Sequence, residues 1–480
     1  MKMAEEAMLK FVDVRRGMPG KRDAILRQSD FDEIYAEYAA AKAEEQASRC
    51  SQCGVPYCQN HCPLHNNIPD WLRMTAEGRL KEAYELSQAT NTFPEICGRI
   101  CPQDRLCEGN CVIELAGHGT VTIGSIEKYI TDTAWENGWV KPNAPTAERG
   151  QSVGIIGSGP GGLAAADQLR AAGLKVTVYE RSDRAGGLLT YGIPGFKLEK
   201  EIVARRVEQL ERAGVDIALN TEVGTDISFD ALRGMHDAVL IATGVYVSRD
   251  LQAPGSGAEG IVKAIDYLTA SNKKGLGDEV ADFDCGTLDA KGKRVVVIGG
   301  GDTAMDCVRT AIRQGAASVK CLYRRDRANM PGSLREVQNA EEEGVEFVWL
   351  TAPKGFAGDE NVSGVMVQKM RLGAPDASGR QTPEMIEGAD YVEPADLVIK
   401  ALGFTPENLP EKWGLDGLEV TDWGTVKGDF VSHETSLEGV YVCGDIQRGA
   451  SLVVWAIRDG REAADAMLEY LNTNAEIAAE

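Results

Sequence analysis

Eight of the twelve cysteines lie in two short runs within the first quarter of the chain. Thiolates spaced a few residues apart, beside prolines, are the ligands that iron–sulfur clusters require, because each iron takes a thiolate from a short, folded-back segment. Such clusters carry single electrons, so the pattern predicts a source and an acceptor of electrons elsewhere. The runs are Cys50, Cys53, Cys58 and Cys62, followed by Pro63, and Cys97, Cys101, Cys107 and Cys111, with Pro102 after Cys101.

Other uses of clustered cysteines fit the sequence less well. A disulfide framework is typical of small chains in oxidising compartments, whereas this chain has 480 residues. Structural zinc favours paired C-x2-C knuckles, and only Cys50 and Cys53 have that spacing. Inert thiols are a third alternative. Iron–sulfur clusters are the favoured interpretation.

The net charge and the N-terminal sequence indicate which partners and which compartment suit this protein. The net charge of −22 argues against a nucleic-acid partner and against an anionic membrane surface. The first residues are charged, and no apolar run of membrane-spanning length follows them. We therefore expect a cytoplasmic protein that binds neither nucleic acid nor membrane.

The texture of the sequence changes near residue 146. Before this point the chain lacks strand alternation, and the segments 31–47 and 68–88 have the apolar spacing of helices. A linker rich in proline follows at 141–146. After it, short apolar strands alternate with glycine turns and helices, which predicts an α/β architecture.

The first glycine turn connects a strand at 152–156 to an Ala-rich helix, and a second strand at 175–179 ends at Glu180. In such a unit one glycine permits the tight turn, the next lets the backbone approach a pyrophosphate, and the third lets helix and strand pack closely. An acidic residue at the end of the second strand accepts hydrogen bonds from ribose hydroxyls. The unit predicts a dinucleotide site. Its glycines are Gly157, Gly159 and Gly162.

The second glycine turn follows a strand at 294–298, and its partner strand at 319–323 ends at Arg324 and Arg325. Guanidinium groups bind a 2′-phosphate that a carboxylate would repel, so this unit is predicted to select NADP(H). Asp326 lies within the same basic segment, and its negative charge slightly disfavours a 2′-phosphate there. The three turn positions are Gly299, Gly301 and Ala304.

One acidic and one arginine-ended unit indicate FAD in the first and NADPH in the second. A flavin is needed because NADPH delivers two electrons whereas a cluster carries one. Many related flavoproteins reduce a C-x-x-C disulfide, but no cysteine lies between Cys111 and Cys285, and the last four cysteines are isolated. The clusters are therefore the predicted outlet for the electrons.

The chain resembles the small (beta) subunit of bacterial NADPH-dependent glutamate synthase, and it shares a module with the N-terminal region of dihydropyrimidine dehydrogenase. The segments that carry the resemblance are 50–58 (CSQCGVPYC), 67–71 (NIPDW), 96–102 (ICGRICP), 299–307 (GGGDTAMDC) and 444–445 (GD). It implies a helical iron–sulfur domain followed by two Rossmann-like domains, the second inserted in the first. The implied limits are 1–146 for the iron–sulfur domain, 147–275 and 408–480 for the FAD domain, and 276–407 for the NADPH domain.

The resemblance also completes the expected cofactor sites. No residue of this chain is expected to act as a catalytic acid or base, because the cofactors transfer the hydride and the electrons. The residues expected at FAD are Gly157, Gly159, Gly162, Glu180, Arg181, Gly187, Leu188, Thr243, Gly244, Gly444, Asp445 and Val453. Those expected at NADPH are Gly299, Gly301, Asp302, Thr303, Ala304, Arg324, Arg325 and Gly403.

For the clusters, the resemblance implies ligands that alternate between the two runs. A cysteine before proline serves the other cluster in two-cluster ferredoxins, and Cys62 precedes Pro63. Glu127 stands where the related dehydrogenase has a glutamine ligand, and Cys97 is the alternative to it. The implied sets are Cys50, Cys53, Cys58 and Cys111 for one [4Fe-4S] cluster, and Cys62, Cys101, Cys107 and Glu127 for the other.

The implied activity is electron input to glutamate synthesis. Electrons would pass from NADPH through FAD and the clusters to FMN on a large partner subunit, where glutamate forms from 2-oxoglutarate and glutamine. The alternative is the input subunit of a pyrimidine-reducing or ferredoxin–NADP transhydrogenase complex. A non-catalytic cluster scaffold is a different class of function, against which the two intact nucleotide turns argue.

Overall fold

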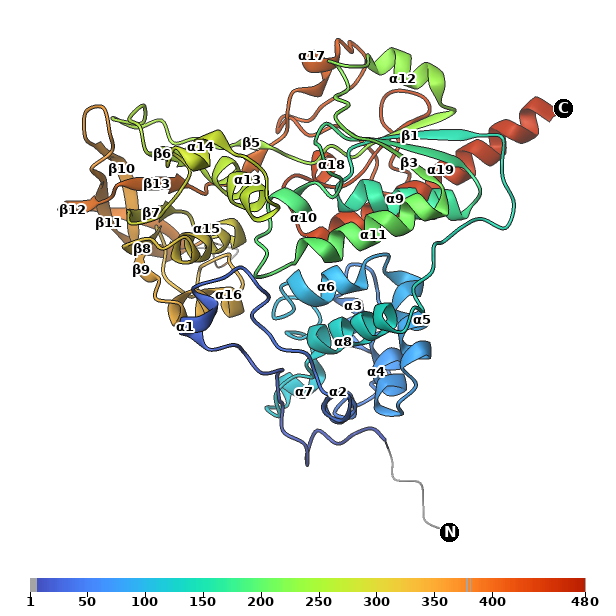
Figure 1. Ribbon diagram of the computed structural model, residues 1–480, viewed down its shortest axis with the longest axis horizontal. Helices are drawn as coiled ribbons and strands as arrows, with labels where there is room; N and C mark the ends of the chain where they lie inside the picture. Colours follow the sequence, from blue (N-terminus) through green and yellow to red (C-terminus); the bar gives the residue numbers. More distant parts are fainter. Residues whose placement is uncertain (1–6, 377–378, 380, 480) are drawn as a thin grey trace.

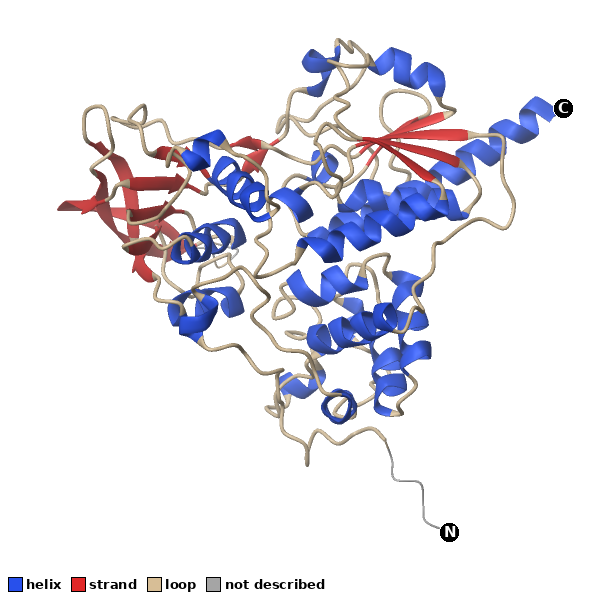
Figure 2. Ribbon diagram, viewed as in Figure 1, coloured by secondary structure: helices blue, strands red, loops and turns tan. Residues whose placement is uncertain are grey.

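Three bodies meet around a common centre in the computed structural model, which describes residues 7–376, 379 and 381–479 (Figure 1). The N-terminal region is helical and lies at the bottom of the view, and two α/β domains lie above it (Figure 2). This arrangement matches the predicted fold class. Among the described residues, no helix combines the length and the apolar character needed to span a bilayer.

Short helices build the N-terminal region around a core that contains Trp71 and Ile126. The predicted helix at 31–47 begins only at Ala40, because the preceding residues are extended and Tyr35 forms a β-bridge with Lys21. The segment 68–88 contains two helices, separated at Gly78, whose φ of 72° ends the first. The helices are α1 (Ala24–Arg27), α2 (Ala40–Ala47), α3 (Tyr57–Asn60), α4 (Ile68–Ala76), α5 (Leu80–Thr90), α6 (Pro94–Ile100), α7 (Val112–Leu115) and α8 (Ile123–Glu136).

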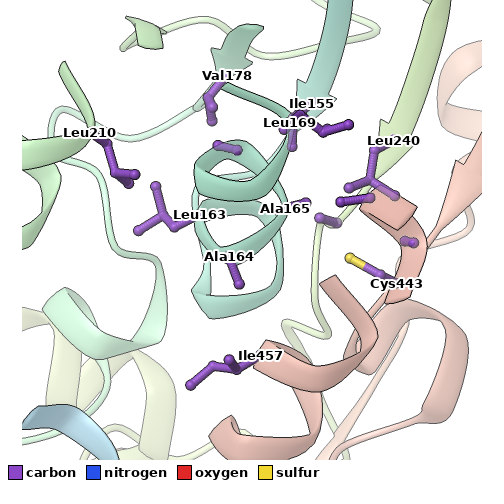
Figure 3. Close-up of a cluster of buried hydrophobic side chains, with 14 of the residues drawn as sticks. Ile155, Leu163, Ala164, Ala165, Leu169, Val178, Leu210, Leu240, Cys443 and Ile457 are labelled. Atoms are coloured by element: carbon purple, nitrogen blue, oxygen red, sulfur yellow. The ribbon is translucent and has the colours of Figure 1, made fainter. Parts of the chain in front are cut away.

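The first Rossmann-like domain has a parallel sheet of order β15-β4-β1-β2-β3. Helix α9 lies between this sheet and the C-terminal helix α19, and Figure 3 shows Ile155 and Leu240 of the strands facing Ala165 of α9, with Ile457 of α19 beyond it. The strands are β1 (Ser152–Ile156), β2 (Lys175–Tyr179), β3 (Val215–Ala218), β4 (Ala238–Ile241) and β15 (Val440–Val442). The helices are α9 (Pro160–Ala171), α10 (Leu188–Tyr191), α11 (Lys200–Ala213), α12 (Phe229–Met235), α17 (Leu409–Trp413), α18 (Asp445–Arg448) and α19 (Val453–Ala479).

The second Rossmann-like domain repeats the pattern with a parallel sheet of order β6-β13-β7-β8-β9, next to an antiparallel sheet of order β10-β11-β12. The parallel strands are β6 (Ile261–Lys263), β7 (Arg294–Ile298), β8 (Ser318–Tyr323), β9 (Glu346–Trp349) and β13 (Leu397–Lys400). The antiparallel strands are β10 (Thr351–Ala357), β11 (Gly364–Pro375) and β12 (Gln381–Pro394). The helices are α13 (Ala264–Gly275), α14 (Ala281–Asp284), α15 (Asp302–Arg313) and α16 (Leu334–Glu342).

Two connections join the α/β domains, and they run side by side. Strand β5 (Val247–Ser248) leaves the first domain and pairs antiparallel with β14 (Phe404–Thr405), which returns to it. The predicted limit at residues 275 and 276 is corrected, because β6 pairs with β13 and α13 packs in the core of the second domain. Residues 261–275 therefore belong to the second domain.

Candidate flavin, nucleotide and iron–sulfur sites

A cavity of about 220 Å³ opens at the carboxyl edge of the first parallel sheet. Gly157 forms its tight turn with a φ of 106°, and a Cβ there would lie 2.5 Å from the carbonyl oxygen of Ala242. Only glycine fits such a position. The predicted FAD residues that line the cavity are Gly157, Gly159, Glu180, Arg181, Leu188, Thr243, Gly244, Gly444, Asp445 and Val453.

The other two predicted residues, Gly162 and Gly187, lie outside this lining. A Cβ on Gly162 would lie 2.1 Å from the carbonyl oxygen of Gly157, so its glycine lets α9 pack against β1. Gly187 has a φ of 53°, and its Cβ would lie 3.1 Å from the Cα of Gly159. Both glycines therefore shape the turn from behind.

Glu180 is buried at the end of β2, where the first unit places its acidic residue. Its carboxylate accepts hydrogen bonds from the backbone N–H groups of Ser158 (3.1 Å) and Ser182 (2.8 Å), and from the Ser158 hydroxyl. These bonds fix the carboxylate at the cavity wall, in the position of a ribose-binding acid.

Polar groups in the same cavity fit a large polar ligand. The Thr243 hydroxyl is buried and has no hydrogen-bond partner among the described residues. Burial raises the pKa of Asp445 to about 6, although its carboxylate accepts from the N–H (3.1 Å) and hydroxyl (2.7 Å) of Ser451. Helix α19 begins directly afterwards at Val453, so its positive dipole end faces the cavity.

The wall also contains residues that were not predicted from the sequence, among them Tyr246 and Glu407, which contact the predicted residue Arg181. Arg181 lies over the Tyr246 ring, with its guanidinium carbon 4.5 Å from the ring centroid, and its Nη1 lies 3.0 Å from Glu407. Lys412 and Trp413 also line the cavity. Glu407, Lys412 and Trp413 approach the cavity only after the chain has returned from the second domain, and no local motif marks them.

The second glycine turn repeats the geometry of the first. Gly299 has a φ of 149°, and its Cβ would lie 2.3 Å from the carbonyl oxygen of Ala401, just as Gly157 meets Ala242. Gly301 caps α15, and Asp302 and Thr303 begin that helix, with Ala304 fully buried behind them. Gly403 has a φ of 91° at the end of the loop after β13. The turn thus offers a helix N-terminus to a phosphate.

The basic segment after β8 contains two arginines that are available to contact a nucleotide. Arg327 is paired with Glu341 at 2.6 Å, whereas neither Arg324 nor Arg325 forms an ion pair with any described residue. The Nε of Arg325 is buried and without a hydrogen-bond partner there. Asp326 accepts instead from the N–H (3.0 Å) and side-chain amide (2.7 Å) of Asn329, so it does not neutralise either arginine by direct contact.

The first cysteine cavity draws thiols from both runs. Cys50, Cys53 and Cys58 surround it together with Cys111, which comes from the end of the second run. Burial raises the pKa of Cys50 to about 11 and that of Cys58 to about 12, so these thiols would become thiolates only beside compensating positive charge. Iron provides that charge, and the thiol set fits an iron–sulfur cluster.

The second cysteine cavity contains Cys62 of the first run with Cys97, Cys101 and Cys107 of the second, and Glu127 from α8. Burial raises the pKa of Cys62 to about 12. Both candidates for the last ligand, Cys97 and Glu127, thus lie at the same cavity. Among the described residues, no three His, Cys, Asp or Glu side chains converge as ligands of a single metal ion.

Glu127 and Cys97 differ in their hydrogen bonds. The Oε1 of Glu127 accepts from the side-chain amides of Asn66 (2.9 Å) and Asn91 (3.3 Å). The Cys97 thiol donates towards the side-chain Oδ1 of Asn91 at 3.9 Å. Two amide donors stabilise a charged carboxylate, and burial still raises the pKa of Glu127 to about 8.

Residues that are neighbours in the chain, or one shared residue, connect the walls of the three cavities. Val453 and Ala456 of α19 line the flavin-sized cavity, and Val454, between them in the chain, lines the second cysteine cavity. Ile123 at the start of α8 lines both cysteine cavities. The order in space is therefore the dinucleotide cavity, the second cysteine cavity and the first cysteine cavity.

Comparison with known families agrees with this division. Residues 27–139 match the family model described as dihydropyrimidine dehydrogenase domain II, 4Fe-4S cluster. Residues 151–460 match the model described as pyridine nucleotide-disulphide oxidoreductase.

Similar proteins with assigned names narrow the family. The chain is 64% identical to the glutamate synthase [NADPH] small chain of Azospirillum brasilense, over 99% of this chain and 98% of the relative. This chain belongs to the glutamate synthase [NADPH] small-chain family. The glutamate synthase [NADPH] small chain of Escherichia coli K12 is 47% identical over 96% of this chain and 98% of its own length. Family membership confirms the predicted resemblance, the iron–sulfur domain and the flavin oxidoreductase class.

Among solved structures, the glutamate synthase small-chain fold is similar to that of FprA from Mycobacterium tuberculosis in complex with NADPH. The TM-score is 0.58 at 23% identity, over 69% of this chain and 86% of that one. This similarity concerns the fold alone.

The turn geometry predicts that Gly157→Ala prevents flavin binding. Alanine would place its Cβ 2.5 Å from a backbone oxygen and would need a φ of 106°, so the turn must distort where the pyrophosphate is expected. We expect at least a tenfold loss of flavin per chain, measured by absorbance near 450 nm. Gly150→Ala, at a glycine with nothing within 4 Å of its Cβ position, is the control and should keep its flavin. Full flavin content in Gly157→Ala would contradict the assignment.

Proposed function

We propose that this chain is the electron-input subunit of a glutamate synthase. It binds NADPH at the second glycine turn, FAD at the first, and two [4Fe-4S] clusters in the helical domain. When bound, FAD accepts a hydride from NADPH and releases single electrons, which the clusters carry. The acceptor is FMN on a large partner subunit, which forms L-glutamate from 2-oxoglutarate and glutamine. The alignment of the three cavities is the observation that supports this proposal most directly.

The chain's own residues bind and orient these groups. The first domain, at about 147–248 and 404–480, holds FAD through Glu180 and the N-terminus of α9. The second domain, at about 249–403, holds NADPH through the turn at Gly299 and the arginines after β8. The paired strands β5 and β14 support these revised limits.

The cavity order supports a path from the flavin through the second cluster to the first. Val454 lines the second cysteine cavity and follows Val453, which lines the flavin cavity, and Ile123 lines both cysteine cavities. Side chains this small and apolar keep neighbouring sites close and exclude water. The first cluster is thus the exit, where the partner subunit binds.

The surface beside the first cysteine cavity supports this exit. Tyr57 and Val112 line the cavity and are also exposed, as are their neighbours Val55 and Leu115. Leu115 is 78% exposed. Exposed apolar side chains gathered at one place are typical of a protein interface.

The nucleotide preference can be tested on the flavin-loaded chain, which should oxidise NADPH with ferricyanide as an artificial acceptor. Replacing Arg324 and Arg325 together by alanine removes the two arginines that no carboxylate neutralises. We expect the KM for NADPH to rise about 10- to 100-fold, as lost charge-assisted hydrogen bonds would give. The KM for NADH should change less than about twofold, since NADH has no 2′-phosphate.

Arg327→Ala is the matched control, because Arg327 is held by Glu341 and should not contact the nucleotide. Equal losses with NADPH and NADH in the double variant would contradict the 2′-phosphate assignment. A flavin-loaded wild-type chain that does not oxidise NADPH would contradict the proposed function itself.

We also propose Glu127, rather than Cys97, as the fourth ligand of the second cluster. The side-chain amides of Asn66 and Asn91 hold the Glu127 carboxylate in place at the cavity, whereas the Cys97 thiol is directed towards an acceptor. Glu127→Ala should therefore remove one cluster, and Cys97→Ala should leave both. Iron and sulfide content and the electron paramagnetic resonance spectrum of the reduced protein measure this. The reverse pattern would assign the ligand to Cys97.

A further inference from the structure

A second large cavity lies where the helical domain meets both α/β domains. It has a volume of about 270 Å³, similar to the 220 Å³ or so of the flavin cavity, and shares none of that cavity's lining residues. Its walls come from the N-terminal segment 18–40, from α8, from the segment before α11 and from α15 and α16. No residue of the proposed electron path lines it. The proposed function leaves this cavity without a role.

The basic side chains that line this cavity are paired, with one exception. Arg99 contacts Asp132 at 2.7 Å, Lys128 contacts Glu33, Lys197 contacts Asp306 at 2.8 Å and Arg309 contacts Glu336 at 2.5 Å. Arg335, at the start of α16, forms no ion pair with any described residue. Its Nε is buried without a hydrogen-bond partner, and its Nη2 reaches only the Arg99 carbonyl oxygen at 3.5 Å.

The carboxylates that face Arg335 are engaged elsewhere. Glu336 is paired with Arg309 at 2.5 Å. Asp104 accepts from the Ser333 hydroxyl at 3.1 Å. Glu108 accepts from the Gly124 N–H (3.1 Å) and from Arg16 (3.3 Å). Arg335 is partly buried, and a guanidinium with an unused buried donor is costly; an anion supplied from solution would offset that cost.

The rest of the lining describes the body of such a ligand. Tyr35 lies beneath Arg335, with the ring centroid 5.9 Å from the guanidinium carbon, and Phe196 and Tyr129 form other walls. Glu37 and Glu136 are exposed at the rim. Aromatic walls favour a flat or apolar body, and acidic groups at the entrance disfavour polyphosphates.

We propose that this cavity binds a small organic monoanion with an aromatic body, whose anionic group contacts Arg335. The ligand would contact α16 of the nucleotide domain and α8 of the cluster domain together. Its binding would therefore stabilise the arrangement of these domains. The site goes beyond the proposed electron transfer and does not depend on it.

Indole-3-acetate and its neutral analogue indole-3-acetamide are suitable probes. They are titrated by calorimetry into the flavin- and cluster-loaded chain, with NADP⁺ present to fill the nucleotide site. We expect one indole-3-acetate per chain and at least tenfold weaker binding of the amide, because the amide lacks the charge that Arg335 recognises.

Arg335→Gln should weaken the binding of indole-3-acetate at least tenfold and change the binding of the amide less than about twofold. The reason is that the Arg335 substitution and the change from acetate to amide both remove the contact between the guanidinium and the carboxylate. Arg371→Gln, on the exposed hairpin β11–β12, is the control and should bind like the wild type. Thr133→Phe, on the α8 wall, should fill the cavity and weaken both probes, which covers the case of a poorly folded Arg335 variant. Absent or non-saturable binding to the wild type, or unchanged binding to both cavity variants, would overturn the proposal.

Discussion

Convergence of two cysteine runs on two buried cavities is the constraint that organises this molecule. Cys111 must reach the cavity of the first run, and Cys62 must reach that of the second, so neither run can close a cavity alone. Burial raises the pKa of Cys58 in the first cavity and of Cys62 in the second, which makes the thiolate form of these two residues depend on bound iron. The helices between the runs therefore have to pack around both sites at once. Folding of the helical domain and loading of its clusters are expected to be coupled.

A buried ion pair then holds this domain against the flavin cavity. Glu95 of α6 accepts two hydrogen bonds from Arg206 of α11, at 2.7 and 2.9 Å, and both side chains are buried. Loss of one partner of such a pair typically costs about 3–5 kcal/mol, because the other charge stays buried. The pair lies in the same layer as Cys97 and Cys101, whose side chains share a core with α9 and α19. This packing holds α19 at both cavities, because Val453 lines the dinucleotide cavity and Val454 lines the second cysteine cavity.

Much of the fold could be predicted from local sequence patterns. The strands at 152–156, 175–179 and 294–298 have their predicted limits, because each is a short apolar run that ends at a turn or at a polar residue. The limit at residue 275 was wrong because β6 has three residues and is defined only by pairing with β13, more than a hundred residues later in the chain. Tyr246 and Trp413 were missed for a similar reason, since tertiary packing alone brings them to the flavin cavity. The grouping of cysteines came from family resemblance, not from their spacing.

Alternation of the two runs is the claim on which the electron path rests, and single cysteine variants test it directly. Iron content and the electron paramagnetic resonance spectrum of the reduced protein should be compared for Cys53→Ala, Cys111→Ala, Cys62→Ala and Cys107→Ala. We predict that Cys53→Ala and Cys111→Ala lose the same cluster signal, and that Cys62→Ala and Cys107→Ala lose the other. If Cys53→Ala instead matches Cys62→Ala, and Cys107→Ala matches Cys111→Ala, each run would bind its own cluster and the account would be contradicted.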